Sequence, residues 1–203
     1  AEQEEAAAEN MLREAAALDP ANWDAQRMLT ALTAESNEEY VQYLVSKCDE
    51  VEHDLALKIA SAQDPYEREA AGDLTRRPYL RWLATLASRA LISGRYRMSL
   101  DAANRSLDFA PNDPAGVRHT AMLAMAKLEY PAEELKRFRS AHSVPHLANT
   151  PLRRRPKDAE RDLDPWTLIA LMSAAWRELD YEGAEHYLRI LVRSCPHAAE
   201  ALY

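Results

Sequence analysis

Apolar residues recur at helical spacing along almost the whole chain. A clear example is the set Leu83, Leu86, Ala87, Ala90 and Leu91, whose members lie on one face of a helix. No segment alternates apolar and polar residues as a half-buried strand does. The pattern predicts an all-α protein with helices over residues 3–18, 21–34, 38–62, 76–92, 96–109, 114–128, 132–141, 165–179 and 181–194, and a last helix from residue 198.

Proline and glycine mark the ends of these predicted helices. Asp19-Pro20 and Asp64-Pro65 each end a helical run, because proline disfavours the helical conformation in the residue before it. Gly94 supplies a C-terminal cap position. Asp113-Pro114 has the pattern of an N-cap followed by proline at the first helical position. We therefore expect short helices joined by tight turns.

One register of four residues occurs twice in the chain. A leucine, a tyrosine, a small residue and a proline follow each other at intervals of 10, 3 and 12 residues, as Leu86, Tyr96, Ser99 and Pro111 and again as Leu171, Tyr181, Ala184 and Pro196. Such a register is typical of tetratricopeptide hairpins, in which the small residue lets two helices approach closely. The intervals between hairpin-ending prolines do not follow the repeat's period. We therefore predict an irregular tetratricopeptide-like α-solenoid of stacked antiparallel hairpins, forming one domain over residues 1–203.

Three further segments carry a resemblance to a known family. They are residues 75–81 (TRRPYLR), residues 111–118 (PNDPAGVR) and Pro196-His197. Together they resemble a family of bacterial tetratricopeptide-like proteins with a TRPYxR segment followed by a PNDxxGVR segment. The chain departs from that pattern by an extra arginine in the first segment and by a longer, arginine-rich loop. The resemblance implies a helical-repeat fold and no particular biochemical activity.

Composition narrows the class of protein. The chain has 203 residues, of which 47% are hydrophobic and only 4 are glycine, so it can form one sizeable helical core. Its longest apolar runs, Leu168–Met172 and Ala121–Ala126, are far shorter than the roughly 20 residues that cross a bilayer. No signal segment opens the chain, and its two cysteines, Cys48 and Cys195, fit a reducing compartment. We expect a cytoplasmic protein with no membrane partner.

Charge is spread unevenly along the chain. Residues 1–74 carry a net charge of −13 and residues 75–203 a net charge of +5, which gives the total of −8. An acidic first third disfavours nucleic acid there. The proline-rich stretch 142–164 contains the basic run Arg153–Lys157, and its length indicates an irregular loop. A nucleic-acid adaptor that uses this loop is an alternative hypothesis, and a solvated loop is the simpler interpretation.

Candidate chemistry is sparse, and we predict neither an enzyme nor a bound cofactor. The glycines are too isolated for a phosphate-binding loop or a nucleophile elbow. Glu50 and His53 have the spacing of a metal-binding pair on a helix, but no second pair accompanies them. His142 and His146 flank Pro145 in the predicted loop. A metal-binding helical protein is therefore a second alternative.

The helix that begins at Asp164-Pro165 carries two apolar stripes. Leu168, Leu171, Met172, Ala175 and Leu179 form the stripe expected to pack the hairpin, and the second stripe consists of Trp166, Ile169, Ser173 and Trp176. Helical solenoids bind peptides on their concave side, and tryptophan is enriched at binding hot spots. Burial of both tryptophans by the loop or by neighbouring helices is the simpler interpretation.

The repeat register places four more side chains on the concave side, namely Arg81, Ser88, Arg118 and Met122. Guanidinium groups bind carboxylates bidentately, so we expect a protein or peptide partner with an acidic or carboxylate group. Pairing of Arg118 with an internal acid is the alternative. The predicted function is a non-catalytic binding scaffold that uses Arg81, Ser88, Arg118, Met122, Trp166, Ile169 and Trp176.

The start of the chain bears on self-association. The sequence begins at Ala1 without methionine, and the predicted helix 3–18 looks like half of a hairpin. An incomplete edge of this kind would expose apolar surface and favour a homodimer, which is a further alternative for the partner.

Overall fold

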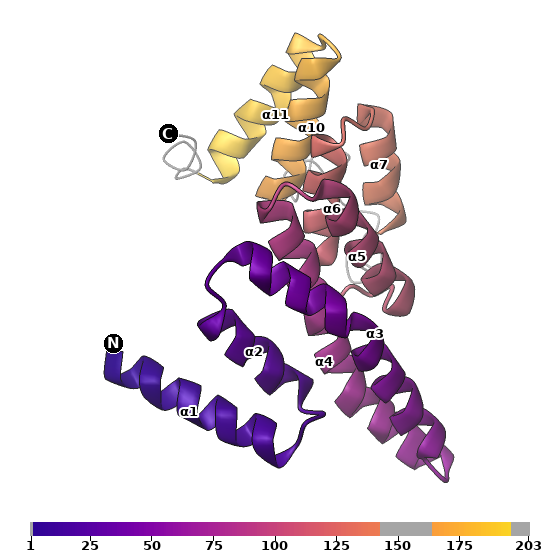
Figure 1. The fold of residues 1–203 in the computed structure, drawn as a ribbon. Coiled ribbons are helices and arrows are strands. Elements are labelled where there is room, and N and C mark those ends of the chain that lie inside the picture. The colour runs from indigo at the N-terminus through magenta and orange to yellow at the C-terminus, as the bar shows by residue number, and fades with distance from the viewer. Residues whose placement is uncertain (1, 143–163, 196–203) are drawn as a thin grey trace. The chain divides into compact units, whose positions relative to one another are not determined.

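The computed structural model describes residues 2–142 and 164–195, and within these ranges the regular structure is entirely helical (Figure 1). The chain divides into two compact units, Ala1–Ser93 and Gly94–Tyr203, where the sequence predicts one domain. The first unit contains α1 (Glu2–Leu18), α2 (Trp23–Thr33), α3 (Asn37–Ser61) and α4 (Pro65–Ile92). The second contains α5 (Tyr96–Phe109), α6 (Val117–Lys127), α7 (Ala132–Ala141), α10 (Pro165–Arg177) and α11 (Tyr181–Ser194).

The core of the first unit lies between its two long helices. α3 packs along α4, α2 contacts both of them, and α1 packs on α2 (Figure 1). Trp82 of α4 is fully buried, and its indole N–H donates to the Leu44 carbonyl of α3 at 3.0 Å. Trp23 of α2 meets the Trp82 ring edge-on, with 6.0 Å between ring centroids. The buried indole is thus packed and hydrogen-bonded, so its burial leaves no unsatisfied donor.

The start of α4 corrects a sequence prediction. The sequence predicts a helix over 76–92, but α4 begins at Pro65. Asp64 accepts a hydrogen bond from Glu67 N at 2.8 Å, and Glu67 accepts one from Gln63 N at 3.0 Å. The pair resembles a capping box, except that Glu67 reaches the N–H of Gln63, one residue before the N-cap Asp64. Pro65 stands at the first helical position. Asp64-Pro65 therefore follows the end of α3, as predicted, and also opens the next helix.

The second unit is organised around α6 and α10. α6 packs against α5, α7 and α10, while α10 also packs against α7 and α11. Leu168 of α10 and Leu191 of α11 are buried together in the hairpin that these two helices form. The observed bounds of α5, α7 and α11 are those predicted. The predicted last helix and residues 143–163 of the predicted loop lie outside the described residues.

The start of α6 also differs from the prediction. The helix begins at Val117 and not at residue 114, with Gly116 as its N-cap in the left-handed region. Asp113 has φ 47°, and its carboxylate accepts hydrogen bonds from Val117 N at 2.8 Å and Arg118 N at 3.3 Å. The predicted N-cap and first-position proline are therefore wrong, because Asp113 caps the helix from four residues upstream and leaves Pro114 in the turn.

None of the helices in the described ranges is both long and apolar enough to cross a membrane. The longest, α4, carries charged residues along its length. This agrees with the absence of long apolar runs in the sequence.

Candidate functional site

The seven residues predicted to bind a partner fall in both units. Arg81 and Ser88 lie on α4 in the first unit. Those in the second unit lie on two helices, Arg118 and Met122 on α6 and Trp166, Ile169 and Trp176 on α10.

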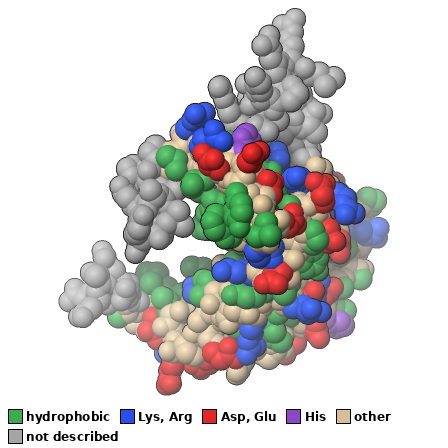
Figure 2. Space-filling view, turned by 90° about the horizontal axis from the view of Figure 1, so that it is seen from above, with side chains coloured by type: hydrophobic (Ala, Val, Ile, Leu, Met, Phe, Trp, Pro, Cys, Tyr) green, Lys and Arg blue, Asp and Glu red, His purple; other side chains and the backbone are tan. Residues whose placement is uncertain are grey.

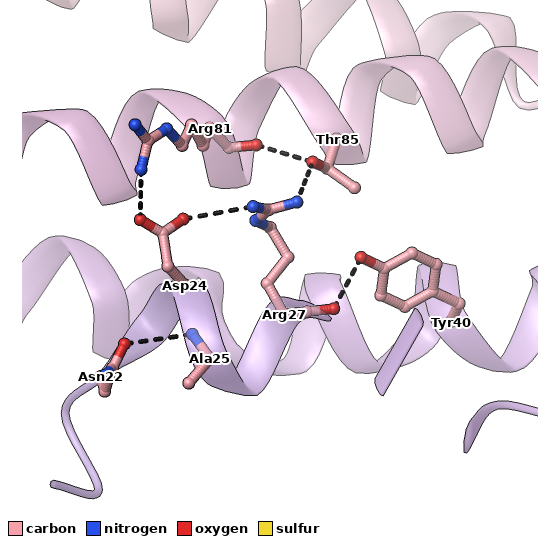
Figure 3. A network of polar contacts seen from close by, with 7 residues as sticks. All are labelled: Asn22, Asp24, Ala25, Arg27, Tyr40, Arg81 and Thr85. Carbon is pink, nitrogen blue, oxygen red and sulfur yellow. Dashed lines mark hydrogen bonds and ion pairs between the residues drawn. The ribbon is translucent and has the colours of Figure 1, made fainter. Parts of the chain in front are cut away.

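Arg81 takes part in a polar network that joins α2 to α4 (Figure 3). Its Nη1 lies 2.5 Å from Asp24 Oδ2, and Arg27 Nη2 lies 3.2 Å from Asp24 Oδ1. Arg27 Nη1 also donates to Thr85 Oγ1 at 3.2 Å. The Asp24 carboxylate therefore forms ion pairs with two guanidinium groups. Its ion pair with Arg81 links α2 to α4.

Tyr40 of α3 extends this network to a third helix. Its hydroxyl donates to the Arg27 carbonyl at 2.9 Å, as Figure 3 shows, and the Arg89 guanidinium lies 5.5 Å from its ring centroid. Burial raises the pKa of the Tyr40 phenol, so it stays protonated as the donor. Ser88 is exposed on α4 close in sequence to Arg89. This network was not predicted from the sequence, although Asp24 and Arg27 stand at the helical spacing of an ion pair.

In the second unit, Arg118 pairs with an internal acid, which is the alternative that the sequence left open. Its Nη1 lies 3.1 Å from Asp113 Oδ2, and the Asp113 side chain is buried. The Arg118 side chain is only 25% exposed. Met122 lies in the core with 2% of its surface exposed. Arg118 and Met122 therefore take part in the internal structure of α6.

The two tryptophans of α10 are exposed. Trp166 has 53% and Trp176 has 63% of its surface accessible. Ser173 is exposed on the same face, and Ile169 is partly buried against Leu168 and Leu191. The neighbouring helices therefore do not bury either tryptophan, whereas the other predicted cover, the loop 143–163, lies outside the described residues. We call the face formed by Trp166, Ile169, Ser173 and Trp176 the α10 surface.

An aromatic and aliphatic cluster stands at the turn between α10 and α11. The rings of Trp176 and Tyr181 meet at 70° with 5.1 Å between centroids, and Tyr181 is 54% exposed. Leu179, which the sequence assigns to the packed stripe, is 70% exposed and belongs to the turn. We call Trp176, Leu179 and Tyr181 the turn cluster. Figure 2 views the structure from above the view of Figure 1 and shows hydrophobic side chains gathered beside acidic and basic ones.

The backbone of Leu179 is strained. Its φ is 63°, in the left-handed region that costs a residue with a side chain about 1–2 kcal/mol. Gly94, which precedes Tyr96 just as Leu179 precedes Tyr181, adopts φ 74° without that cost. Glu129, between α6 and α7, has φ 64°, but its side chain is polar and its exposure costs little. Leu179 is therefore both strained and exposed.

Hydrogen bonds hold the turn in place. Leu179 N donates to the Trp176 carbonyl at 3.2 Å and Asp180 N to the Ala175 carbonyl at 2.9 Å. Arg177 and Glu178 bind the connection between α6 and α7, through the Tyr130 carbonyl at 3.0 Å and Ala132 N at 2.8 Å, respectively. The backbone that carries the turn cluster is thus held by hydrogen bonds within the turn and by hydrogen bonds to the connection between α6 and α7.

Asp164 fixes the other end of α10. It accepts a hydrogen bond from Thr167 N at 2.9 Å, and its Oδ1 lies 3.0 Å from His119 Nδ1 of α6. Burial by itself would raise the pKa of the Asp164 carboxyl. The nearby His119 imidazole and the hydrogen bonds from Thr167 outweigh that effect and hold the pKa of this carboxyl well below its usual range. The N-terminal end of α10, where Trp166 lies, is therefore held in a fixed position.

The described part of the chain holds no group of three or more His, Cys, Asp or Glu side chains that could bind a metal ion. Glu50, one of the predicted metal-binding pair, has its Oε1 2.7 Å from Lys47 Nζ. His53 is exposed on α3. The basic run Arg153–Lys157 and His146 lie outside the described residues, so the nucleic-acid alternative stays a prediction.

Comparisons with protein-family models, with curated proteins and with solved structures find no match to this chain. The resemblance of residues 75–81 and 111–118 to tetratricopeptide-like proteins therefore stays a prediction. In the structure these residues belong to two different settings, one inside α4 and the other at the start of α6. The candidate function depends on the geometry of the exposed aromatic side chains.

Proposed function

We propose that this chain is a non-catalytic, protein-binding helical protein whose α10 surface contacts the partner. The exposure of Trp166 and Trp176 on one helix carries this proposal. Soluble proteins bury most of their large aromatic side chains, and exposed tryptophans are enriched at the centres of protein interfaces. Two on one short helix therefore favour a binding surface over chance exposure.

The exposed tryptophans supply part of the energy that recognition of a partner requires. Covering about 100 Å² of exposed indole surface contributes about 2.5 kcal/mol at about 25 cal/mol per Å². The α10 surface is also held rigidly, because Asp164 caps one end of the helix and Arg177 and Glu178 bind neighbouring backbone at the other. A rigid surface loses little conformational entropy when a partner binds.

The finer architecture belongs to the same proposal. We propose that the helices stack as an irregular tetratricopeptide-like solenoid. The α10–α11 hairpin supports this, since Tyr181 opens the second helix and the small residue Ala184 is buried there. In such solenoids the surfaces of successive hairpins form extended binding faces.

Arg81 and Arg118 have a smaller part in this proposal than the sequence suggested. Both guanidinium groups already pair with carboxylates of their own unit, Arg81 with Asp24 and Arg118 with Asp113. A partner carboxylate would have to compete with these pairs. The case for an acidic partner is therefore weakened, whereas the case for an aromatic contact surface is strengthened.

Site-specific photo-crosslinking tests the proposal. A photoreactive phenylalanine analogue replaces Trp166 or Trp176, and a third variant carries it in place of Asp101, which is exposed on α5 of the same unit. Each variant is irradiated in lysate of the cells from which the chain comes, after circular dichroism has shown unchanged helix content. We expect one protein to be crosslinked from positions 166 and 176 and not from position 101. Absence of a crosslink, or equal crosslinking from all three positions, would overturn the proposal.

A further inference from the structure

Leu179 distinguishes the α10–α11 turn from the corresponding turn after α4. Two residues before the tyrosine that opens the second helix, the turn after α4 has Gly94 and the turn after α10 has Leu179. Their φ values are similar and positive, 74° and 63°. Glycine adopts this conformation freely, whereas leucine does not. Burial does not compensate, because Leu179 is 70% exposed. The left-handed conformation ends α10 through the hydrogen bonds of Leu179 N and Asp180 N, but this role needs no leucine side chain, which is left exposed.

The aromatic rings beside Leu179 are arranged to accept a cation. The planes of Trp176 and Tyr181 stand at 70° to each other with centroids 5.1 Å apart, and more than half of each residue's surface is exposed. Indole and phenol rings attract ammonium and guanidinium groups over their faces. The pair leaves aromatic surface accessible for such a group to stack on.

The charge of the surrounding segment also favours a cation. Between Arg177 and Glu185 the chain carries one basic and four acidic side chains, the acidic ones being Glu178, Asp180, Glu182 and Glu185, all exposed. Glu178 and Asp180 accept backbone hydrogen bonds, from Ala132 N and Gly183 N. Glu182 follows Tyr181 directly, and Glu185 lies one helical turn after it on the same face. Arg189 Nε of α11 lies 3.8 Å from Glu185 Oε1, a distance typical of a weak surface pair, and Lys136 of α7 interacts electrostatically with Glu178.

We propose that the turn cluster is the docking site for an arginine or lysine side chain of the protein partner. The cation stacks on Trp176 and Tyr181, its aliphatic stem lies on Leu179, and Glu182 and Glu185 balance its charge. This inference rests on the proposed function, and it assigns to that partner a basic segment. The carboxylate-bearing partner expected from the sequence would be repelled from this end of the unit.

Selection from a display library of short random peptides tests the inference without knowledge of the partner. Peptides are selected on the intact chain, and the strongest binders are synthesised for affinity measurement by fluorescence anisotropy. We expect the selected peptides to share an arginine or lysine. Replacing that residue by the uncharged citrulline or norleucine is expected to weaken binding about tenfold, as the loss of one cation–π and ion-pair contact should.

Variants of the chain then locate the contact. Tyr181→Leu removes the aromatic face, and the double variant Glu182→Gln/Glu185→Gln removes the negative charge. Each is expected to lower the affinity for the selected peptide several-fold. Tyr181→Phe retains the ring and is expected to retain binding, which separates loss of the contact from loss of folding. Asp101→Asn with Asp108→Asn is the matched control, because it removes two exposed carboxylates from α5 of the same unit.

The outcomes distinguish this inference from the proposed function. Two outcomes would overturn the inference and leave the protein-binding function standing. In the first, the selected peptides lose affinity when Trp176 is replaced but contain no cation. In the second, they bind the Glu182/Glu185 variant as tightly as the unmodified chain. Failure to select any peptide that depends on Trp166 or Trp176 would overturn both. Cationic peptides that lose affinity with Tyr181→Leu and with the charge variant, but not with the Asp101/Asp108 control, would support both.

Discussion

At the scale of single residues, the structure shows which apolar side chains are exposed, and the spacing of apolar residues alone does not. Leu179 fits the apolar stripe of α10 by spacing, yet the helix ends at Arg177 and the left-handed turn places the leucine in solvent. The conformation of a turn residue depends on how the chain reverses, which periodicity does not encode. The exposure of Trp166 and Trp176 likewise depends on which face of α10 meets α6, α7 and α11. Both tryptophans were predicted as binding residues from the sequence, whereas Tyr181 was identified only as a member of the repeat register.

The first prediction concerns Leu179→Gly. Glycine removes the cost of the left-handed conformation, and little burial is lost because the leucine is 70% exposed. We expect the free energy of unfolding to rise by about 1 kcal/mol and the melting temperature by about 2–4 °C, measured by thermal denaturation. The same change should weaken the selected cationic peptide. Glu129→Gly is the matched control, which should stabilise without affecting peptide binding. A less stable Leu179→Gly variant would contradict the strain assigned to this turn.

Asp164 predicts a dependence of stability on pH. The pKa of its carboxyl is lower in the folded chain than the usual value of about 3.9 in an unfolded one. Its contribution is therefore fully present above about pH 4 and is lost as the pH falls below that value toward the folded pKa. We expect urea denaturation between neutral and acidic pH to show a smaller loss of stability for Asp164→Asn than for the unmodified chain. Parallel pH profiles would contradict the shift.

At the scale of helices, the sequence predicted most accurately the helices that have clear start and stop signals. α5 and α11 open two residues after a residue with positive φ, and α7 follows Pro131, so local signals set their limits. The first part of α4 was missed because its side chains are mostly exposed and form no apolar stripe. Asp64 and Glu67 carried the signal for its start, but the proline between them was taken only as the end of α3. A helix without a buried face is detectable from its cap alone.

A prediction at the scale of α6 concerns Asp113→Ala. The buried Asp113 carboxylate accepts hydrogen bonds from Val117 N, Arg118 N and the Arg118 guanidinium. Its removal leaves the first turn of α6 uncapped and is expected to lower the free energy of unfolding by about 2 kcal/mol. Asn112→Ala, one residue away on the exposed side of the same turn, should change it by less than about 0.5 kcal/mol. Chemical denaturation followed by circular dichroism measures both, and equal effects would contradict the capping role.

At the scale of the whole molecule, the sequence predicted the all-α class, and the structure adds that the helices group into two compact units. Helix-forming composition and helical periodicity determine the class directly. The division falls at Ser93–Gly94, inside the first predicted hairpin, where the sequence shows only an ordinary turn. Which helices share a core depends on contacts between residues distant in sequence, such as Trp82 with Leu44, and no local pattern specifies these.

The net charge of the chain predicts how the docking of a basic segment responds to salt. The total of −8 attracts a cationic peptide only at long range, because residues 75–203, which include the turn cluster, carry a net charge of +5; the local attraction there comes from Glu182 and Glu185. Raising the ionic strength shortens the Debye length from about 30 Å at 0.01 M to about 8 Å at 0.15 M. We therefore expect the association rate of a selected peptide to fall steeply over this range in stopped-flow fluorescence. The Glu182→Gln/Glu185→Gln variant should retain the long-range part of this dependence, because most of the net charge remains, but should dissociate faster at every salt concentration. A dissociation rate equal to that of the unmodified chain would place the bound cation away from these two carboxylates.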